Sequence, residues 1–175
     1  KKDHADVTAL FTRFEDASDR DEKVEIAGEI CRKLTIHALC EEELLYPAAH
    51  ETLDDDLVYE AEVEHQCARD LIARIEDADP DDGNFDAMVK VLCEYVRHHV
   101  KEEEGEMFPQ LKRSDVDLAA LGVALAERRT ELESALGADE DEDDADDLDD
   151  DDDYDDEIDV DIDVEDDGDE GNRDR

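Results

Sequence analysis

His37-Ala-Leu-Cys-Glu41-Glu42-Glu43-Leu-Leu-Tyr46-Pro47 is a segment that the chain uses twice, because it returns as His99-Val-Lys-Glu-Glu103-Glu104-Gly-Glu-Met-Phe108-Pro109. Both copies read His-x3-Glu-Glu and then place an apolar residue, an aromatic ring and a proline at matching offsets. Residues four apart lie on one face of a helix, so each copy directs an imidazole and a carboxylate the same way. Two such helices that face each other offer two nitrogens and two carboxylates to one interior volume, which is how helical bundles build a two-metal site.

Apolar residues recur at helical spacing in four long segments, which we predict as helices at about residues 2–17, 21–49, 54–77 and 85–110. Pro47 is expected to end or kink the second helix near its last turns. A shorter fifth helix is expected at about residues 115–136, with Gly137 as its stop. The short connections predict an all-α fold, an up-down-up-down four-helix bundle that occupies residues 1–137.

Acidic residues dominate the composition, with 61 Asp and Glu against 18 Lys and Arg and a formal net charge of −43. From Asp139 onward, 25 of 37 residues are acidic, against two arginines. A segment of this composition cannot bury enough apolar surface to fold, so residues 138–175 are predicted to form a disordered acidic tail. The tail either keeps the protein soluble or captures a protein partner, for example by strand addition of residues 157–165, where acids alternate with β-branched residues.

The same charge argues against binding to nucleic acid or to anionic membranes, since phosphate contacts need clustered lysine and arginine. The sequence holds no apolar run near 18 residues, so no membrane-spanning segment is predicted. Four cysteines are widely spaced, and each falls inside a predicted helix. This usage is typical of reduced core cysteines, and we expect a cytoplasmic protein.

Six polar residues interrupt the apolar stripes of the four long helices. These are His4, His37, Glu41, His65, His99 and Glu103. A single histidine on an apolar face is usually a core residue with a satisfied hydrogen bond, but here each helix supplies one and two lie in matched frames. A buried carboxylate costs several kcal/mol unless it is paired, protonated or bound to metal, and these stripes carry no lysine or arginine. The set therefore predicts a metal site.

Imidazole and carboxylate ligands without thiolate suit iron, manganese or zinc. We predict two iron ions bridged by Glu41 and Glu103, and spacing alone leaves zinc and manganese open. His50 and His98 lie off the stripes and are expected at the surface or at the rim of the bundle. His98 is a substitute ligand if the register of the fourth helix shifts by one residue.

Over residues 2–110 the chain resembles the hemerythrin-like (HHE cation-binding) domain family. The resemblance rests on Asp3-His4, on the two His-x3-Glu-Glu frames that end in Tyr46-Pro47 and Phe108-Pro109, and on Glu64-His65. It implies a non-haem di-iron site in a four-helix bundle. In that site the four inward histidines are terminal ligands and the two inward glutamates are the bridges.

The resemblance also implies a protein that binds or senses dioxygen, nitric oxide or peroxide. Two alternatives remain open. One is an enzyme that decomposes peroxide or reduces nitric oxide, and the other is an iron-sensing module whose acidic tail recruits a partner.

The sequence departs from the oxygen-carrying hemerythrins on the third helix. Those proteins place two histidines there, one turn apart, whereas here Arg69 follows His65 by one turn and Ala61 precedes it by one. One imidazole is therefore missing, and we expect water, Glu64 or another acid in its place. Glu42 and Glu104 follow the predicted bridges in both frames. Each is either a solvated helix-face acid or an outer partner that holds the N–H of a ligand histidine.

Overall fold

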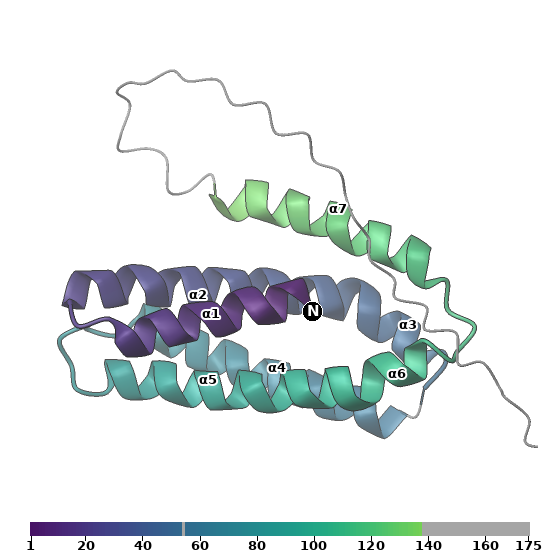
Figure 1. The fold of residues 1–175 in the computed structure, drawn as a ribbon, viewed down its shortest axis with the longest axis horizontal. Helices are drawn as coiled ribbons and strands as arrows, with labels where there is room; N and C mark the ends of the chain where they lie inside the picture. The colour runs from purple at the N-terminus through teal and green to yellow at the C-terminus, as the bar shows by residue number, and fades with distance from the viewer. Residues whose placement is uncertain (54, 138–175) are drawn as a thin grey trace, which may run out of the picture. The chain divides into compact units, whose positions relative to one another are not determined.

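The protein is described by a computed structural model that covers residues 1–53 and 55–137, and these ranges are helical apart from short connections (Figure 1). The four long helices are α1 (Lys2–Asp16), α2 (Arg20–Cys40), α4 (Asp55–Glu76) and α5 (Phe85–Glu102). Packing of α1 on α2, α2 on α4, α4 on α5 and α5 on α1 closes the bundle. The predicted all-α four-helix bundle is confirmed.

Two of these helices continue beyond a wider turn. The π-helical segment η1 (Glu41–Leu45) joins α2 to α3 (Tyr46–His50), and η2 (Glu103–Met107) joins α5 to α6 (Phe108–Leu111). In each, the backbone N–H of the aromatic residue donates to the carbonyl five residues back, from Tyr46 to Glu41 and from Phe108 to Glu103. Pro47 was expected to end or kink the second helix near its last turns, and helical structure ends three residues after it, at His50. Proline lacks an N–H, and a widened turn directly before it removes the need for that donor.

Apolar side chains fill the bundle in two clusters. The larger joins all four long helices through residues such as Phe11, Ile30, Ile72 and Leu92, each at most 6% exposed. The smaller lies toward α3 and α6 and holds Leu45, Tyr46, Ala49, Val58, Ala61, Met107 and Leu111. On α4 the fully buried residue is Val58, whereas Leu57, which the apolar spacing places inward, is only partly buried against this cluster.

The four inward histidines occupy the level between these clusters. On α2, α4 and α5 the larger cluster lies on one side of the histidine along the helix and the smaller on the other, as with Leu34, His37 and Leu45. Polar groups at this level are therefore sealed from water by apolar layers above and below, which strengthens every electrostatic interaction among them.

The fifth helix, α7 (Leu118–Gly137), lies close to the range predicted at 115–136, and its 20 residues match the length of the bundle helices. It packs on α2 and η1, where Leu132 joins Ile36 and Cys40 in a third apolar cluster. Arg128 adds two hydrogen bonds to Glu43, at 2.7 and 3.0 Å, and Arg129 pairs with Asp3 in the first turn of α1. α7 thus fastens the start of α1 beside His4.

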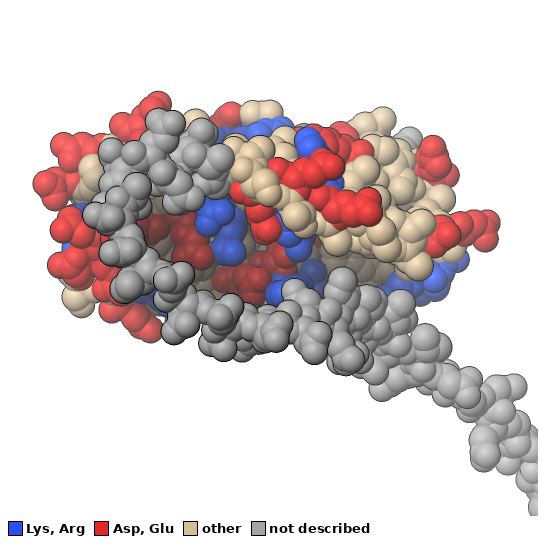
Figure 2. All heavy atoms as spheres, turned by 90° about the horizontal axis from the view of Figure 1, so that it is seen from above, with Lys and Arg blue, Asp and Glu red and all other residues tan. Residues whose placement is uncertain are grey.

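None of the described helices combines the length and the apolar character that crossing a membrane requires. The predicted acidic tail, residues 138–175, lies outside the described residues. On the face shown in Figure 2, acidic and basic side chains are interspersed over the described residues.

Candidate metal centre

All six predicted donors converge on the buried level of the bundle. His4 comes from α1, His37 from α2, His65 from α4 and His99 from α5, while Glu41 and Glu103 are the first residues of the two π turns. Their exposure ranges from 1% to 8%. π turns inside α-helices occur mostly at functional sites, and here each one begins at an inward carboxylate.

The donors form two groups that share members. One group is His37, Glu41, His65 and His99, and the other is His4, His37, Glu41 and Glu103; within each, the ligand atoms all lie within 4.8 Å of one another. Glu103 also reaches toward the first group, because its Oε2 is 3.3 Å from His4 Nε2 and 3.6 Å from His99 Nε2. Two overlapping donor groups are the arrangement that two adjacent ions require.

The spacing of the donor atoms fits ions held between them. Ligand atoms at roughly 2.1 Å from a tetrahedral ion lie about 3.4 Å from one another. Glu41 Oε2 is 3.3 Å from His37 Nε2 and 3.4 Å from His65 Nε2. His65 Nε2 and His99 Nε2 are 3.2 Å apart.

Four buried atoms at this level make no hydrogen bond within the described part of the chain: His4 Nε2, Glu41 Oε2 and both carboxylate oxygens of Glu103. His4 Nε2 and Glu103 Oε2 are 3.3 Å apart, but their geometry is not that of a hydrogen bond. An unsatisfied buried carboxylate oxygen carries a penalty of about 1–3 kcal/mol or more. All four atoms are donors that a cation would satisfy, so the residues present fit a metal centre.

Three of the histidines are held from outside by carboxylates. Glu104 Oε1 is 2.8 Å from His4 Nδ1, Glu42 Oε1 is 3.1 Å from His65 Nδ1, and Glu64 Oε2 is 3.0 Å from His99 Nδ1. A carboxylate only accepts, so each Nδ1 carries the proton and each Nε2 turns its lone pair to the interior. Carboxylate–histidine pairs of this kind orient metal ligands and raise their basicity. Glu42 and Glu104 are therefore outer partners, and Glu64 joins them.

The facing imidazoles of His65 and His99 need a cation between them, because two lone pairs at 3.2 Å repel each other. A proton fills this role when no metal does. Burial alone would lower the pKa of His99, but its contacts with Glu41 and Glu64 and the charge of Glu103 outweigh burial and raise the pKa to about 10. Burial would likewise raise the pKa of Glu41, yet the charge of His37 and the contacts with His65 and His99 hold it far below its usual value.

Metal binding is therefore expected to release a proton. Because its pKa is about 10, His99 is protonated at neutral pH. An ion that binds Nε2 must displace that proton. Apparent affinity for Fe2+ should rise with pH by about tenfold per unit across the neutral range. Anaerobic calorimetry in buffers of different protonation enthalpy measures the release directly. Glu64→Gln, which removes one cause of the raised His99 pKa, should reduce the number of protons released. A pH-independent affinity would contradict this account of His99.

The donor-bearing part of the chain matches a known family, because the profile of the hemerythrin HHE cation binding domain covers residues 1–111. The chain belongs to the hemerythrin HHE cation-binding family. It is thus a metal-binding helical bundle, and the resemblance seen in the two His-x3-Glu-Glu frames is confirmed.

Two relatives match this chain in sequence and differ in how much of their own length is shared. A DNA nickase from Nostoc sp. (strain PCC 7120 / SAG 25.82 / UTEX 2576) is 30% identical over 114 residues, which are 65% of this chain and 32% of the nickase. An uncharacterized hemerythrin-like protein from Schizosaccharomyces pombe is 24% identical over 133 residues, 74% of this chain and 66% of that protein. The chain thus spans about a third of the first relative and about two thirds of the second.

A solved structure shows that the fold is shared. The crystal structure of a hemerythrin HHE cation binding domain-containing protein from Mycobacterium kansasii superposes with a TM-score of 0.68 at 20% identity. The superposition covers 78% of this chain and 86% of that chain.

In this hemerythrin-family chain, Arg69 does not act as a replacement for the missing imidazole. Its guanidinium pairs with Glu42 of η1 and donates to Gln66 Oε1 at 2.9 Å. Glu64, which the sequence offered as a replacement ligand, instead contacts His99 Nδ1 from outside. Neither residue belongs to the two buried donor groups.

Tyr46 brings a further oxygen to the centre, which the sequence did not indicate. Its hydroxyl lies 3.0 Å from His65 Nε2, the nitrogen that faces the interior, and the residue is 1% exposed. Burial and the charges of Glu41 and Glu103 raise the pKa of this phenol. A cation beside it would reverse that shift. The matching position in the second frame is Phe108, whose ring stacks on His4.

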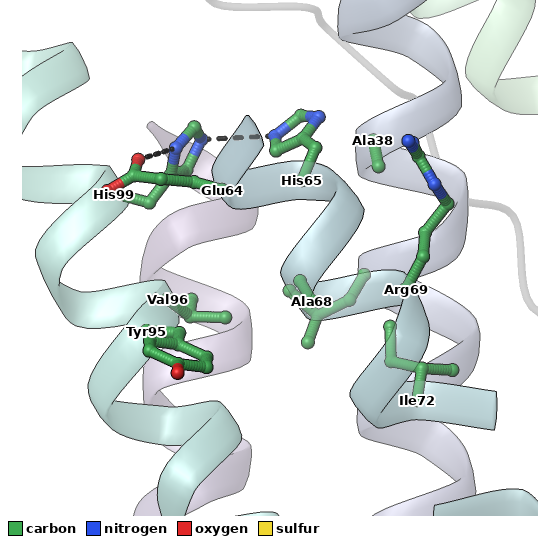
Figure 3. Close-up of a pocket in the computed structure, with 10 residues that line it drawn as sticks. Ala38, Glu64, His65, Ala68, Arg69, Ile72, Tyr95, Val96 and His99 are labelled. Atoms are coloured by element: carbon green, nitrogen blue, oxygen red, sulfur yellow. Dashed lines mark hydrogen bonds and ion pairs between the residues drawn. The ribbon is translucent and has the colours of Figure 1, made fainter. Parts of the chain in front are cut away.

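A cavity of about 30 Å³ opens beside His65 and His99 (Figure 3). Its other walls are mostly apolar and come from α2, α4 and α5, with Leu34, Ala38, Ala68, Ile72 and Val96 among the lining residues. Water needs about 10–15 Å³ by this measure, so the volume suits a molecule of two or three atoms.

The structure places His50 and His98 outside both buried donor groups. His50 Nε2 is 3.3 Å from Glu62 Oε1. The His98 side chain is 57% exposed. Both positions agree with the expectation that these histidines lie at the surface.

Proposed function

We propose that the chain holds two iron ions bridged by Glu41 and Glu103, with His4, His37, His65 and His99 as terminal ligands, and that it binds dioxygen, nitric oxide or peroxide there. The observation that carries the proposal is the pair of buried donor groups that share His37 and Glu41. Zinc and manganese fit the same donors. Iron is favoured because zinc has no redox chemistry and because imidazole–carboxylate Fe2+ sites with open positions are those that support dioxygen chemistry.

The chain's own residues explain how a small ligand would be received. Bound iron would supply redox activity and a coordination position for the ligand. That position would stay open because α4 carries no second histidine one turn from His65. The apolar walls of the cavity admit a small uncharged molecule and disfavour hydrated ions. The outer carboxylates of Glu42, Glu64 and Glu104 would hold the rings of His65, His99 and His4 in fixed orientations while the ligand enters.

An enzyme that decomposes peroxide or reduces nitric oxide is the second candidate. The departure at Arg69 favours it, because a position without a histidine ligand accepts a substrate more easily than a closed one. Turnover assays with hydrogen peroxide and with nitric oxide plus an electron donor separate catalysis from binding. The nickase activity of the relative is not carried over, since the shared segment is 32% of that protein and the 61 acidic residues here oppose a phosphate backbone.

Metal analysis after anaerobic purification tests the proposal, followed by absorption spectra before and after exposure to air. Two irons per chain, with new near-ultraviolet and visible bands in air, are the expected result. Absence of iron, or a single zinc ion per chain, would rule out oxygen chemistry at this centre.

Tyr46→Phe is expected to keep two ions per chain and to change the visible spectrum of the oxidised protein. The hydroxyl faces His65 Nε2 at 3.0 Å, and phenolate is an oxygen donor that suits iron. Loss of a phenolate-to-iron band in this variant, measured on the same iron content, checks the role. Tyr95→Phe is the matched control, because Tyr95 lines the cavity beside His65 and His99 but is 49% exposed. Identical spectra for wild type and Tyr46→Phe would show that the phenol remains protonated.

A further inference from the structure

A second His-x3-Glu frame lies on α5, shifted by one residue from the first. His98 and Glu102 form it, and Glu64 of α4 faces them. His98 Nε2 is 3.2 Å from Glu102 Oε1 and 3.4 Å from Glu64 Oε1, and the three ligand atoms lie within 4.8 Å of one another. These separations are close to the roughly 3.4 Å between ligands of one tetrahedral ion. We refer to these three residues as the outer cluster.

The charges around Glu64 point to a missing cation. Each of the other outer carboxylates has a basic partner, since Glu42 pairs with Arg69, and Glu104 lies 3.8 Å from the Lys1 ammonium. Within the described part of the chain, neither Glu64 nor Glu102 forms an ion pair with a lysine or arginine; Glu64 contacts the imidazoles of His98 and His99, and Glu102 contacts that of His98. The outer cluster thus holds two carboxylates without a lysine or arginine beside them. A bound cation would give Glu64 the counter-charge that Glu42 and Glu104 already have.

We propose that Glu64, His98 and Glu102 form an outer site for a divalent transition-metal ion, separate from the buried two-ion centre. One imidazole and two carboxylates are the ligands that Zn2+, Fe2+ and Mn2+ accept, and three protein ligands leave a position for water. The site is accessible, since the side chains of His98, Glu102 and Glu64 are 57%, 28% and 20% exposed. The outer site rests on these contacts alone and does not depend on which ion occupies the buried centre.

Glu64 links the outer site to the centre. Its Oε1 faces His98 and its Oε2 is 3.0 Å from His99 Nδ1. An ion on Oε1 fixes the carboxylate in the orientation that holds the His99 ring. The outer ion therefore positions a ligand of the buried centre without touching the centre itself.

The test is a titration of the iron-loaded full chain with Zn2+ in millimolar Mg2+. Mg2+ prefers all-oxygen sites, so it occupies the many exposed carboxylates and leaves an imidazole-containing site to Zn2+. We expect one Zn2+ per chain with iron retained. Zinc K-edge absorption should show a nitrogen neighbour at roughly 2.0–2.1 Å.

His98→Ala and Glu102→Gln should each weaken this Zn2+ binding by about tenfold or more, with iron content unchanged. His50→Ala is the matched control, because His50 is a partly exposed histidine of α3 beside Glu62 of α4, and this variant should bind Zn2+ as the wild type does. Equal Zn2+ uptake by wild type and both outer-cluster variants would overturn the proposal, as would Zn2+ gained only in proportion to iron lost. Failure of the proposed buried centre is recognised separately, by wild-type protein that takes up no iron or by iron retained in Glu41→Ala.

Discussion

Glu41→Ala is expected to abolish binding of both metal ions. Glu41 belongs to both buried donor groups, and its Oε2 lies 3.3 to 3.4 Å from the ligand nitrogens of His37 and His65. In the proposed centre, its removal would take a ligand from each ion together with the bridging carboxylate. Metal analysis after anaerobic reconstitution with Fe2+ should find less than one ion per chain, against two in the wild type. A variant that retained two ions would show that this ligand set is wrong.

Glu43→Ala is the matched control for that experiment. Glu43 lies two residues along the same π turn but faces outward to Arg128, so both ions should be retained. In the metal-free state, Glu41→Ala should alter the free energy of unfolding by no more than about 2 kcal/mol, because relief from burying a carboxylate offsets the lost contacts. Thermal unfolding of both metal-free variants separates loss of the ligand from loss of the fold.

Glu42→Gln is expected to lower iron affinity by about 10- to 100-fold while leaving every direct ligand in place. The Glu42 carboxylate accepts from His65 Nδ1 and pairs with Arg69, so it fixes the tautomer and the orientation of the ring. A neutral amide keeps the shape of the side chain but loses the charge that makes the imidazole a stronger donor. Competition for Fe2+ with a chelator of known affinity measures the change.

Glu43→Gln serves as control here as well, since it removes a neighbouring carboxylate that contacts Arg128 and no histidine. The unfolding transition of metal-free Glu42→Gln should match that of the control. Equal iron affinities for the two variants would mean that Glu42 is only a surface partner of Arg69.

The bundle and its donors were predictable because both depend on periodicity within single helices. A period of 3.6 residues identifies the buried face from sequence alone, and histidines and glutamates on that face stand out against apolar neighbours. The two wider turns at Glu41 and Glu103 were not predictable in this way. A π turn rotates the following residues slightly about the helix axis, and the apolar spacing of the sequence does not reveal this rotation. The sequence signal at these turns is the proline that follows each aromatic residue.

Contacts between helices explain the rest of what the sequence did not reveal. Whether Glu64 faces His99 or the metal, and whether Tyr46 reaches His65, depends on how each helix is rotated about its axis relative to its neighbours. Packing of large side chains sets that rotation, and it is a property of the whole core. Arg69 illustrates the limit: the sequence shows an arginine one turn after His65, but its pairing with Glu42 follows only from the position of α4 beside η1.

The repeated segment gives the bundle an approximate internal two-fold symmetry. The first half, α1 to α3, supplies His4, His37 and Glu41, and the second half, α4 to α6, supplies His65, His99 and Glu103. Each half contributes two imidazoles and one carboxylate, and each buried donor group contains residues from both. The donors therefore meet as they would across the interface of a symmetric dimer. In the proposed two-ion centre, a change in the separation of the ions would therefore act on the packing between the halves, of α2 against α4 and of α1 against α5. The packing within each half would not change.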